Sequence, residues 1–179
     1  MSTPSLKRLV GTTVAVVGAG IVAVGPVAAP AQTGLTAAKR ITPSGVDGVK
    51  LGKTYNRLRQ QGLVKRIRKG CELGGPNTRS AGLRAPLKGQ VNFTLKSPRR
   101  VTDITVRGGA KARGVGIGAK IPDIKAAYAK AKVDHSTDAV FELTLVRIPK
   151  NGGGKLQFGV STKTKKVTVI GIPFIAFCE

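Results

Sequence analysis

The stretch Gly48-Val49-Lys50-Leu51-Gly52 returns later in the chain as Gly114-Val115-Gly116-Ile117-Gly118. Two further stretches match in the same register: residues 89–93 (GQVNF) with 154–158 (GKLQF), and residues 101–104 (VTDI) with 167–170 (VTVI). Every matching pair is separated by 65 or 66 residues. The recurring residues are turn glycines and apolar residues, which belong to a scaffold and not to a chemical site. The sequence therefore predicts two tandem copies of one unit, over about residues 46–110 and 111–179.

Each copy is expected to begin with a helix. Thr54 is a candidate N-cap for a short helix over residues 55–61, and Pro122 suits the first turn of a helix within residues 119–131. The apolar residues of the second segment recur at helical spacing and form a stripe that a sheet would bury: Ile121, Ile124, Ala127, Tyr128 and Ala131.

Strands are predicted to follow each helix. Val91, Phe93 and Leu95 alternate with polar residues, and Leu156, Phe158 and Val160 alternate in the same phase. Further strands are expected over residues 101–106, 139–148 and 167–172, with turns at 97–100 and 162–166 and a long loop at 72–88. The predicted fold class is α+β: two helix-plus-antiparallel-strand repeats forming one compact domain over residues 45–179, with the helices packed on one face of the sheet.

The glycine pair around a short extended segment, followed by a helix and strands, resembles a known group of exported proteins. Residues 48–52 and 114–118, with the strand residues Phe93 and Phe158, are similar to the tandem unit of the β-lactamase-inhibitor-protein and SmpA/OmlA group, and most of all to small secreted proteins of actinobacteria. The chain departs from that pattern in having one helix per unit, no tryptophan and a very high positive charge. The resemblance implies a non-catalytic module that binds a partner.

The N-terminal segment has the layout of a secretory signal peptide. Lys7 and Arg8 precede a short apolar run, and Ala29-Pro30-Ala31 supplies the small residues that a signal peptidase reads. We predict a signal peptide over residues 1–31, a flexible lead-in over residues 32–44 and a secreted, extracytoplasmic protein without a transmembrane segment once the signal is removed.

Two cysteines remain in the secreted chain, Cys71 and Cys178. In an exported protein an even pair usually forms a disulfide, and we predict that bridge here. A single histidine and no third cysteine speak against a metal centre, and no cofactor is predicted.

Charge is the second strong signal. The chain has 31 Lys and Arg against eight Asp and Glu, and loss of Lys7 and Arg8 lowers the formal net charge only from +23 to +21. Such a charge attracts polyanions over long distances. The candidate polyanion-binding residues lie in one basic run and two hairpin turns: Lys65, Arg66, Arg68, Lys69, Arg99, Arg100, Lys163, Lys165 and Lys166. The alternative is a solvated basic surface with no dedicated ligand.

Signals for catalysis and for nucleic-acid binding are weak. His135 lies between Asp134 and Asp138 in a polar segment that reads as a loop, and no activated nucleophile accompanies it. Residues 114–118 lack the Gly-Lys-Ser/Thr end of a phosphate loop. Aromatic residues fall on predicted core strands and do not interleave with the basic runs, so nucleic acid is a less favoured partner.

The sequence therefore predicts a secreted, disulfide-closed, non-catalytic binding or structural module of the cell envelope that captures anionic polymers or lipid surfaces through basic turns. The alternative is a protein-binding module, or an inhibitor of an acidic extracellular protein. These two readings differ in the expected response to salt.

Overall fold

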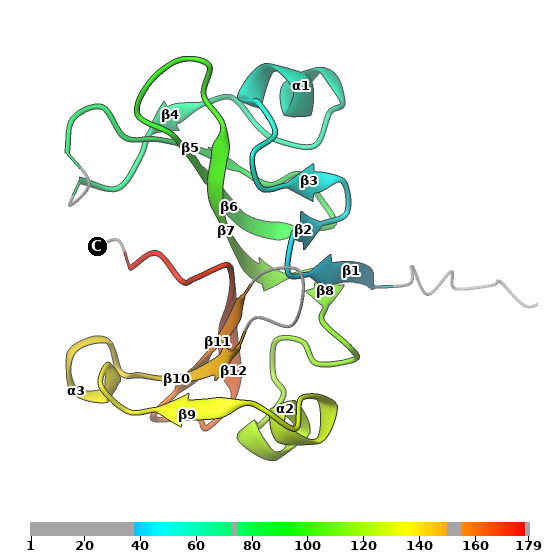
Figure 1. The fold of residues 1–179 in the computed structure, drawn as a ribbon, viewed down its shortest axis with the longest axis vertical. Helices are drawn as coiled ribbons and strands as arrows, with labels where there is room; N and C mark the ends of the chain where they lie inside the picture. Colours follow the sequence, from blue (N-terminus) through cyan, green and yellow to red (C-terminus); the bar gives the residue numbers. More distant parts are fainter. Residues whose placement is uncertain (1–37, 73–74, 150–154, 178–179) are drawn as a thin grey trace, which may run out of the picture. The chain divides into compact units, whose positions relative to one another are not determined.

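The computed structural model describes residues 38–72, 75–149 and 155–177, which belong to one compact unit, Thr36–Glu179 (Figure 1). The predicted signal peptide and the first residues of the predicted lead-in lie outside the described residues. Lys39–Thr42, also in the predicted lead-in, forms strand β1.

An eight-stranded antiparallel sheet dominates this unit, with the strand order β4-β5-β6-β7-β12-β11-β10-β9. Its strands are β4 (Arg68–Lys69), β5 (Arg79–Gly82), β6 (Lys88–Phe93), β7 (Val101–Gly108), β9 (Lys132–Asp134), β10 (Leu143–Ile148), β11 (Leu156–Ser161) and β12 (Val167–Ile172). Neighbours in sequence are mostly neighbours in the sheet, as expected for strands joined by short hairpins.

The strand order is the same when it is read from either edge. Strands β4 to β7 of the first half occupy the positions that β9 to β12 occupy in the second, and β7 and β12 meet in the centre. In that central pair Thr105 lies opposite Gly171, and Ile104 lies opposite Ile172. Thr105 and Gly171 are 66 residues apart, the spacing of the sequence match. An approximate two-fold axis therefore passes through the sheet between these two residues.

The glycines of the recurring sequence stretch have the same backbone role in both halves. Gly48, Gly52, Gly114 and Gly118 all have φ between +76° and +91°, a region that glycine enters without steric cost. The amide of Gly52 donates to the Val101 carbonyl at 2.9 Å, and that of Gly118 donates to Val167 at 2.8 Å. These glycines turn the chain and hold it against the start of β7 and β12.

A second, four-stranded sheet has the order β3-β2-β1-β8. Its strands are β1 (Lys39–Thr42), β2 (Gly45–Val46), β3 (Val49–Lys50) and β8 (Ala110–Lys111). The first three form an antiparallel meander, and β1 pairs with β8 in parallel.

The helices are short: α1 (Tyr55–Gln60), α2 (Ile121–Ala127) and α3 (Asp138–Phe141). Two side chains of α1 are buried, Tyr55 and Leu58, whereas α2 buries Ile124 alone and α3 buries none. The described residues are mostly β, with 43% in strands or isolated bridges against 14% in helices. The predicted α+β class with helices packed on one sheet face is therefore wrong, because these helices are too short to form a layer.

Two local predictions also differ from the structure. The helical pattern over residues 119–131 yields a helix that ends at Ala127, because Tyr128 leaves helical geometry with φ −139° and ψ 87°. The strand predicted over residues 139–148 begins as α3 and becomes β10 only after Glu142, whose φ is 51°.

The two faces of the large sheet differ in chemistry. One face packs into the main core with β1 to β3, β8, α1 and α2, and its fully buried side chains include Val91, Ile104, Val106, Phe158 and Ile170. The opposite face carries the residues that alternate with them along the strands, and it is polar near the centre. We call it the polar face; it includes Ser80, Gln90, Asn92, Asp103, Thr105 and Gln157.

The C-terminal segment, residues 173–177, lies across the polar face (Figure 1). The amide of Ile175 donates to Oε1 of Gln157 at 2.9 Å. The side chain of Ile175 packs with Leu145 and Val169, and the ring of Phe177 stacks on Phe141 with 4.1 Å between centroids. This segment gives the second half of the polar face a small apolar cover.

Candidate functional site

The surface charge of the described residues is almost uncompensated. Each acidic residue in the described ranges already has a polar partner. These contacts are Asp47–Lys39 (3.2 Å), Glu72–Lys69 (2.9 Å), Asp134–Arg147 (2.5 Å), Glu142–Lys163 (2.7 Å), Asp138–His135 (2.8 Å), Asp103–Asn92 (2.7 Å) and Asp123 with the Lys120 amide (2.8 Å). The other lysines and arginines of the described part have no carboxylate partner there. A broad positive field follows, as the composition predicts.

Residues 65–69, which we call the basic arm, run along the β5 edge of the large sheet. The Lys65 amide donates to the Gly82 carbonyl at 2.8 Å, and Arg68 pairs with Ser80 in β4–β5. Ile67 points inward and packs against the core, whereas the four basic side chains of the arm are exposed. Lys69 is partly neutralised by Glu72. The arm therefore presents three unpaired cations on a fixed backbone.

Tyr55 of α1 anchors this arm. Its hydroxyl accepts hydrogen bonds from the Ile67 amide at 3.0 Å and from Arg59 at 3.2 Å. Burial raises the pKa of Tyr55, but these hydrogen bonds and the charges of Arg59 and Arg66 outweigh burial and leave the pKa below its ordinary value.

The first basic turn joins β6 to β7, and its arginines are tied to the backbone. Arg99 is partly buried and donates to the carbonyls of Thr94 at 2.7 Å and Asn77 at 3.1 Å. Arg100 donates to the carbonyl of Gly52 at 3.1 Å. Both arginines therefore brace the turn against neighbouring loops, in addition to the charge they contribute.

The second basic turn joins β11 to β12. Lys163 pairs with Glu142, while Lys165 and Lys166 are exposed and form no ion pair in the described part. Lys165 has a φ of 57°, and its amide closes the turn on the Ser161 carbonyl at 2.9 Å. Lys165 and Lys166 are therefore the two lysines of this turn that lie outside ion pairs in the described part.

The structure does not bring the two turns together. β7 and β12 run antiparallel, so the turn before β7 and the turn before β12 lie at opposite ends of the central strands. At about 3.3 Å per residue, the length of β7 alone separates them by roughly 25 Å. The first turn instead lies beside the loop that follows the basic arm, as the Arg99–Asn77 hydrogen bond shows.

Basic residues on an edge strand also have a structural role. An exposed edge offers unpaired backbone groups to other chains, and lysine or arginine there discourages aggregation. β4 is one edge of the large sheet, and β9, with Lys132, is the other. The charges of the basic arm therefore protect this edge whether or not they bind a ligand.

His135 lies in an exposed turn before α3. Its Nδ1 is 2.8 Å from Oδ2 of Asp138, and Asp134 accepts from the Ser136 amide at 2.9 Å and pairs with Arg147. Hydrogen bonds from Ser136 lower the pKa of Asp134, and the contact with His135 lowers that of Asp138. These contacts stabilise a local turn. Within the described ranges, no group of three or more His, Cys, Asp or Glu could hold a metal ion.

Sequence reasoning missed a buried carboxyl group, Asp103. It is 4% exposed, and its oxygens accept from Asn92 Nδ2 at 2.7 Å and Thr102 Oγ1 at 2.9 Å. Burial raises its pKa, and the two hydrogen bonds oppose that rise only in part. Val101, Asp103 and Ile104 are all buried, which no two-residue alternation predicts, and the register of β6 and β7 shifts at this point, between Asn92 and Phe93.

Cys71 follows the basic arm and lies next to the C-terminal segment. Its Sγ is 3.7 Å from the carbonyl oxygen of Phe177, the residue before Cys178. Cys178 itself lies outside the described residues, so the Cys71–Cys178 bridge stays a prediction.

In the part of the chain that the structure describes, no helix is long and apolar enough to span a bilayer. Comparison of the chain with protein-family models, with curated proteins and with solved structures gave no match.

Proposed function

We propose that this protein is a secreted, non-catalytic module of the cell envelope that captures anionic polymers or anionic lipid surfaces. The observation that carries the proposal is the charge balance of the described surface, where each carboxylate has a partner and most lysines and arginines do not. A ligand with repeated phosphate or carboxylate groups would supply the missing counter-charges. Such binding needs no reacting group.

The basic arm is the first contact surface in this proposal. Lys65, Arg66 and Arg68 are exposed on a backbone that Tyr55 and β5 hold in place, so little backbone entropy is lost when they meet a ligand. The second turn, with Lys165 and Lys166, is a separate contact at the other end of the sheet. Two distant contacts suit an extended polymer, which can reach both along its length.

Capture of this kind is electrostatic, and its strength should fall steeply with salt. The Debye length shrinks from about 10 Å at 0.1 M to about 3 Å at 1 M, which screens exposed charges from the ligand. The alternative function, a module that binds an acidic protein, would use apolar contacts as well. Leu95, Val140 and Phe174 are exposed large apolar residues that such an interface could include, and their contribution would persist at high salt.

The test compares two variants that each lose four positive charges. The first carries Lys65→Ser, Arg66→Ser, Lys165→Asn and Lys166→Ser; asparagine is chosen because it tolerates the positive φ of residue 165. The control carries Lys88→Ser, Lys111→Ser, Lys125→Ser and Lys130→Ser, which are all exposed and belong to neither the arm nor the second turn. Arg99 and Arg100 are left intact because they brace the backbone.

Affinity is measured for poly(glycerol phosphate) and for phosphatidylglycerol vesicles, with phosphatidylcholine vesicles as the neutral comparison. We expect the first variant to lose at least tenfold in affinity and the control less than threefold. Equal losses in both variants would mean that net charge acts without a dedicated surface and would contradict the proposed sites.

A further inference from the structure

We propose that a cleft on the polar face is a discrete binding site for a small phosphate- or carboxylate-bearing sugar or polyol. This inference goes beyond polymer capture and does not depend on it, because it concerns one saturable site at which a single small molecule suffices. The cleft lies beside the C-terminal segment, away from both basic turns.

The cleft has a volume of about 340 Å³ and draws its walls from five segments. Strands β4 to β7 supply one side, and Ala176 of the C-terminal segment supplies the other. The described residues that line it are Arg68, Lys69, Gly70, Cys71, Ser80, Gln90, Arg107 and Ala176. Its volume falls in the range of small-molecule sites, which begins at roughly 300 Å³.

The charged groups at this cleft favour an anion. Arg68 of β4 and Arg107 of β7 have no carboxylate partner among the described residues, whereas Lys69 is neutralised by Glu72. The nearest carboxyl group on the same face, Asp103, is occupied by Asn92 and Thr102 and does not line the cleft. A guanidinium group presents a planar fork of donors that fits phosphate and carboxylate oxygens. Two arginines, one from β4 and one from β7, line this one cleft.

The neutral groups favour a ligand that also carries hydroxyls. The Ser80 side chain is 3% exposed, and its hydroxyl donates to the Lys69 carbonyl at 3.3 Å, which leaves its oxygen able to accept. The Gln90 amide has no hydrogen-bond partner within the described residues, although it both donates and accepts. Unused donors and acceptors of this kind fit a sugar or polyol body better than an apolar one.

The cleft also separates Arg68 and Lys69 from the other residues of the basic arm. Arg66 is exposed two residues earlier but does not line the cleft. Arg66→Gln therefore removes the same charge as Arg68→Gln at almost the same place on the surface. Comparing these two variants distinguishes binding at a specific site from attraction by the general positive charge of the surface.

The experiment is a calorimetric titration of the protein from Gln32 onward at physiological salt with glucose 6-phosphate, inorganic phosphate and glucose. We expect one site per chain for glucose 6-phosphate, weaker binding of inorganic phosphate and none of glucose. Arg68→Gln and Arg107→Gln should each lower the affinity for glucose 6-phosphate by roughly tenfold or more, which is the scale of a charge-assisted hydrogen bond. Arg66→Gln should change it less than twofold. Gln90→Ala should lower the affinity for glucose 6-phosphate and leave the affinity for inorganic phosphate unchanged.

Binding that does not saturate at one ligand per chain, or that responds equally to Arg66→Gln and Arg68→Gln, would overturn the site. Circular dichroism of each variant confirms that it is folded before titration. Loss of polymer binding in the first four-charge variant with intact glucose 6-phosphate binding would separate the two proposals, since that variant retains Arg68 and Arg107.

Discussion

At the scale of single residues, Gly171 shows how one missing side chain makes room for another segment. A Cβ built on Gly171 would lie 2.3 Å from the Phe174 carbonyl carbon and 2.4 Å from the Ile175 amide nitrogen. Real Cβ atoms do not approach backbone atoms so closely, so the C-terminal segment rests directly on this glycine. Its counterpart in the other half, Thr105, carries a side chain and is itself only 2% exposed.

We predict that Gly171→Ala lifts the C-terminal segment from the polar face and lowers the free energy of unfolding by about 1–3 kcal/mol, the usual cost of overpacking. Limited proteolysis should cut the variant near residue 174 faster than the wild type. Gly108→Ala is the matched control, because its Cβ would have only ordinary contacts, with Lys88 at 3.5 Å or more. If both variants have the same free energy of unfolding and the same cleavage rate as the wild type, the C-terminal segment does not pack on Gly171 as described.

Asp103 offers a second test at this scale, through pH. Its pKa is raised in the folded protein, so the folded state holds a proton that the unfolded state has already released. Between the unfolded pKa, about 3.9, and the higher folded value, Asp103 therefore makes the protein less stable as the pH rises. We expect Asp103→Asn to become more stable, relative to the wild type, as the pH rises above about 4 in urea unfolding, until Asp103 is ionised in the folded state.

Asp134→Asn is the control of opposite sign. The pKa of Asp134 is lowered, so its charged form stabilises the folded state, and that stability is lost as the pH falls through the folded pKa. This variant should lose stability, relative to the wild type, as the pH rises from below the folded pKa of Asp134 to just above its unfolded pKa of about 3.9, and the difference should stay constant at higher pH. A pH-independent difference for Asp103→Asn would show that residue 103 does not titrate as described.

At the scale of elements, the alternating strands were predictable and the helices were less so. Residues 91–93 and Leu156–Ser161 are strands as their alternation indicates, because a half-buried strand needs only a two-residue period. The helical stripe over residues 119–131 gave a seven-residue helix, because the chain must turn at Tyr128 to reach β9. β1, β2 and β3 left no periodic signal, since two to four residues are too few to show one.

Local sequence patterns were also insufficient to predict the contacts of the candidate site. The basic residues can be read from the sequence, but their hydrogen bonds cannot. Arg99 donates to Asn77 and Arg100 donates to Gly52, and these hydrogen bonds join segments that are 22 and 48 residues apart. The cleft between β4 to β7 and Ala176 depends on where the C-terminal segment lies, which no local pattern records.

The anchoring of the basic arm by α1 gives a prediction at this scale. Tyr55→Phe keeps the ring contact with Phe93, 5.6 Å between centroids, but removes the acceptor for the Ile67 amide. We expect a loss of about 1 kcal/mol in the free energy of unfolding and faster amide exchange at Ile67. The control is Tyr128→Phe, because the Tyr128 hydroxyl has no hydrogen-bond partner in the described part. Unchanged exchange at Ile67 in Tyr55→Phe would show that β5 alone holds the arm.

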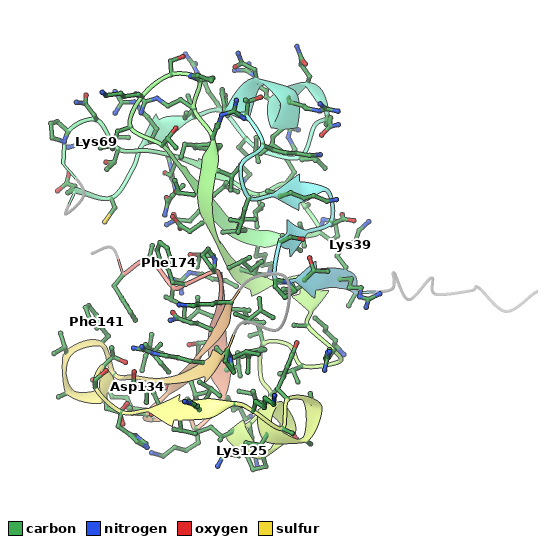
Figure 2. All side chains as sticks on the ribbon, viewed as in Figure 1. Lys39, Lys69, Lys125, Asp134, Phe141 and Phe174 are labelled. Atoms are coloured by element: carbon green, nitrogen blue, oxygen red, sulfur yellow. The ribbon has the colours of Figure 1, made fainter. Side chains whose placement is uncertain are left out.

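At the scale of the whole molecule, the two-fold arrangement of the sheet determines how charge is displayed. Equivalent turns point in opposite directions, so Lys165 and Lys166 cannot share a small ligand with the basic arm. Figure 2 shows Lys69 and Lys125 at opposite ends of the described unit, which makes Lys125 a fair control for the arm. A long anion could contact both the basic arm and the second turn, whereas a small anion can bind at only one place.

Closure of the chain is a second property of the whole molecule. The Cys71 sulfur lies beside Phe177, and we predict that it is bridged to Cys178 in the secreted protein. Such a bridge should stabilise the fold by about 4–5 kcal/mol in the chain-entropy model. Mass spectrometry without reductant should find no alkylated cysteine, and reduction should lower the melting temperature. Alkylation of both cysteines in the unreduced native protein would contradict the bridge.

The most direct test of the central claim is the affinity of the protein from Gln32 onward for poly(glycerol phosphate) as salt is raised from 50 to 500 mM. Capture by unpaired surface cations predicts that the logarithm of the binding constant falls linearly and steeply with the logarithm of salt concentration, and that neutral dextran does not bind at any salt. Affinity that is independent of salt, or absent at physiological salt, would contradict the account and would point to a protein partner.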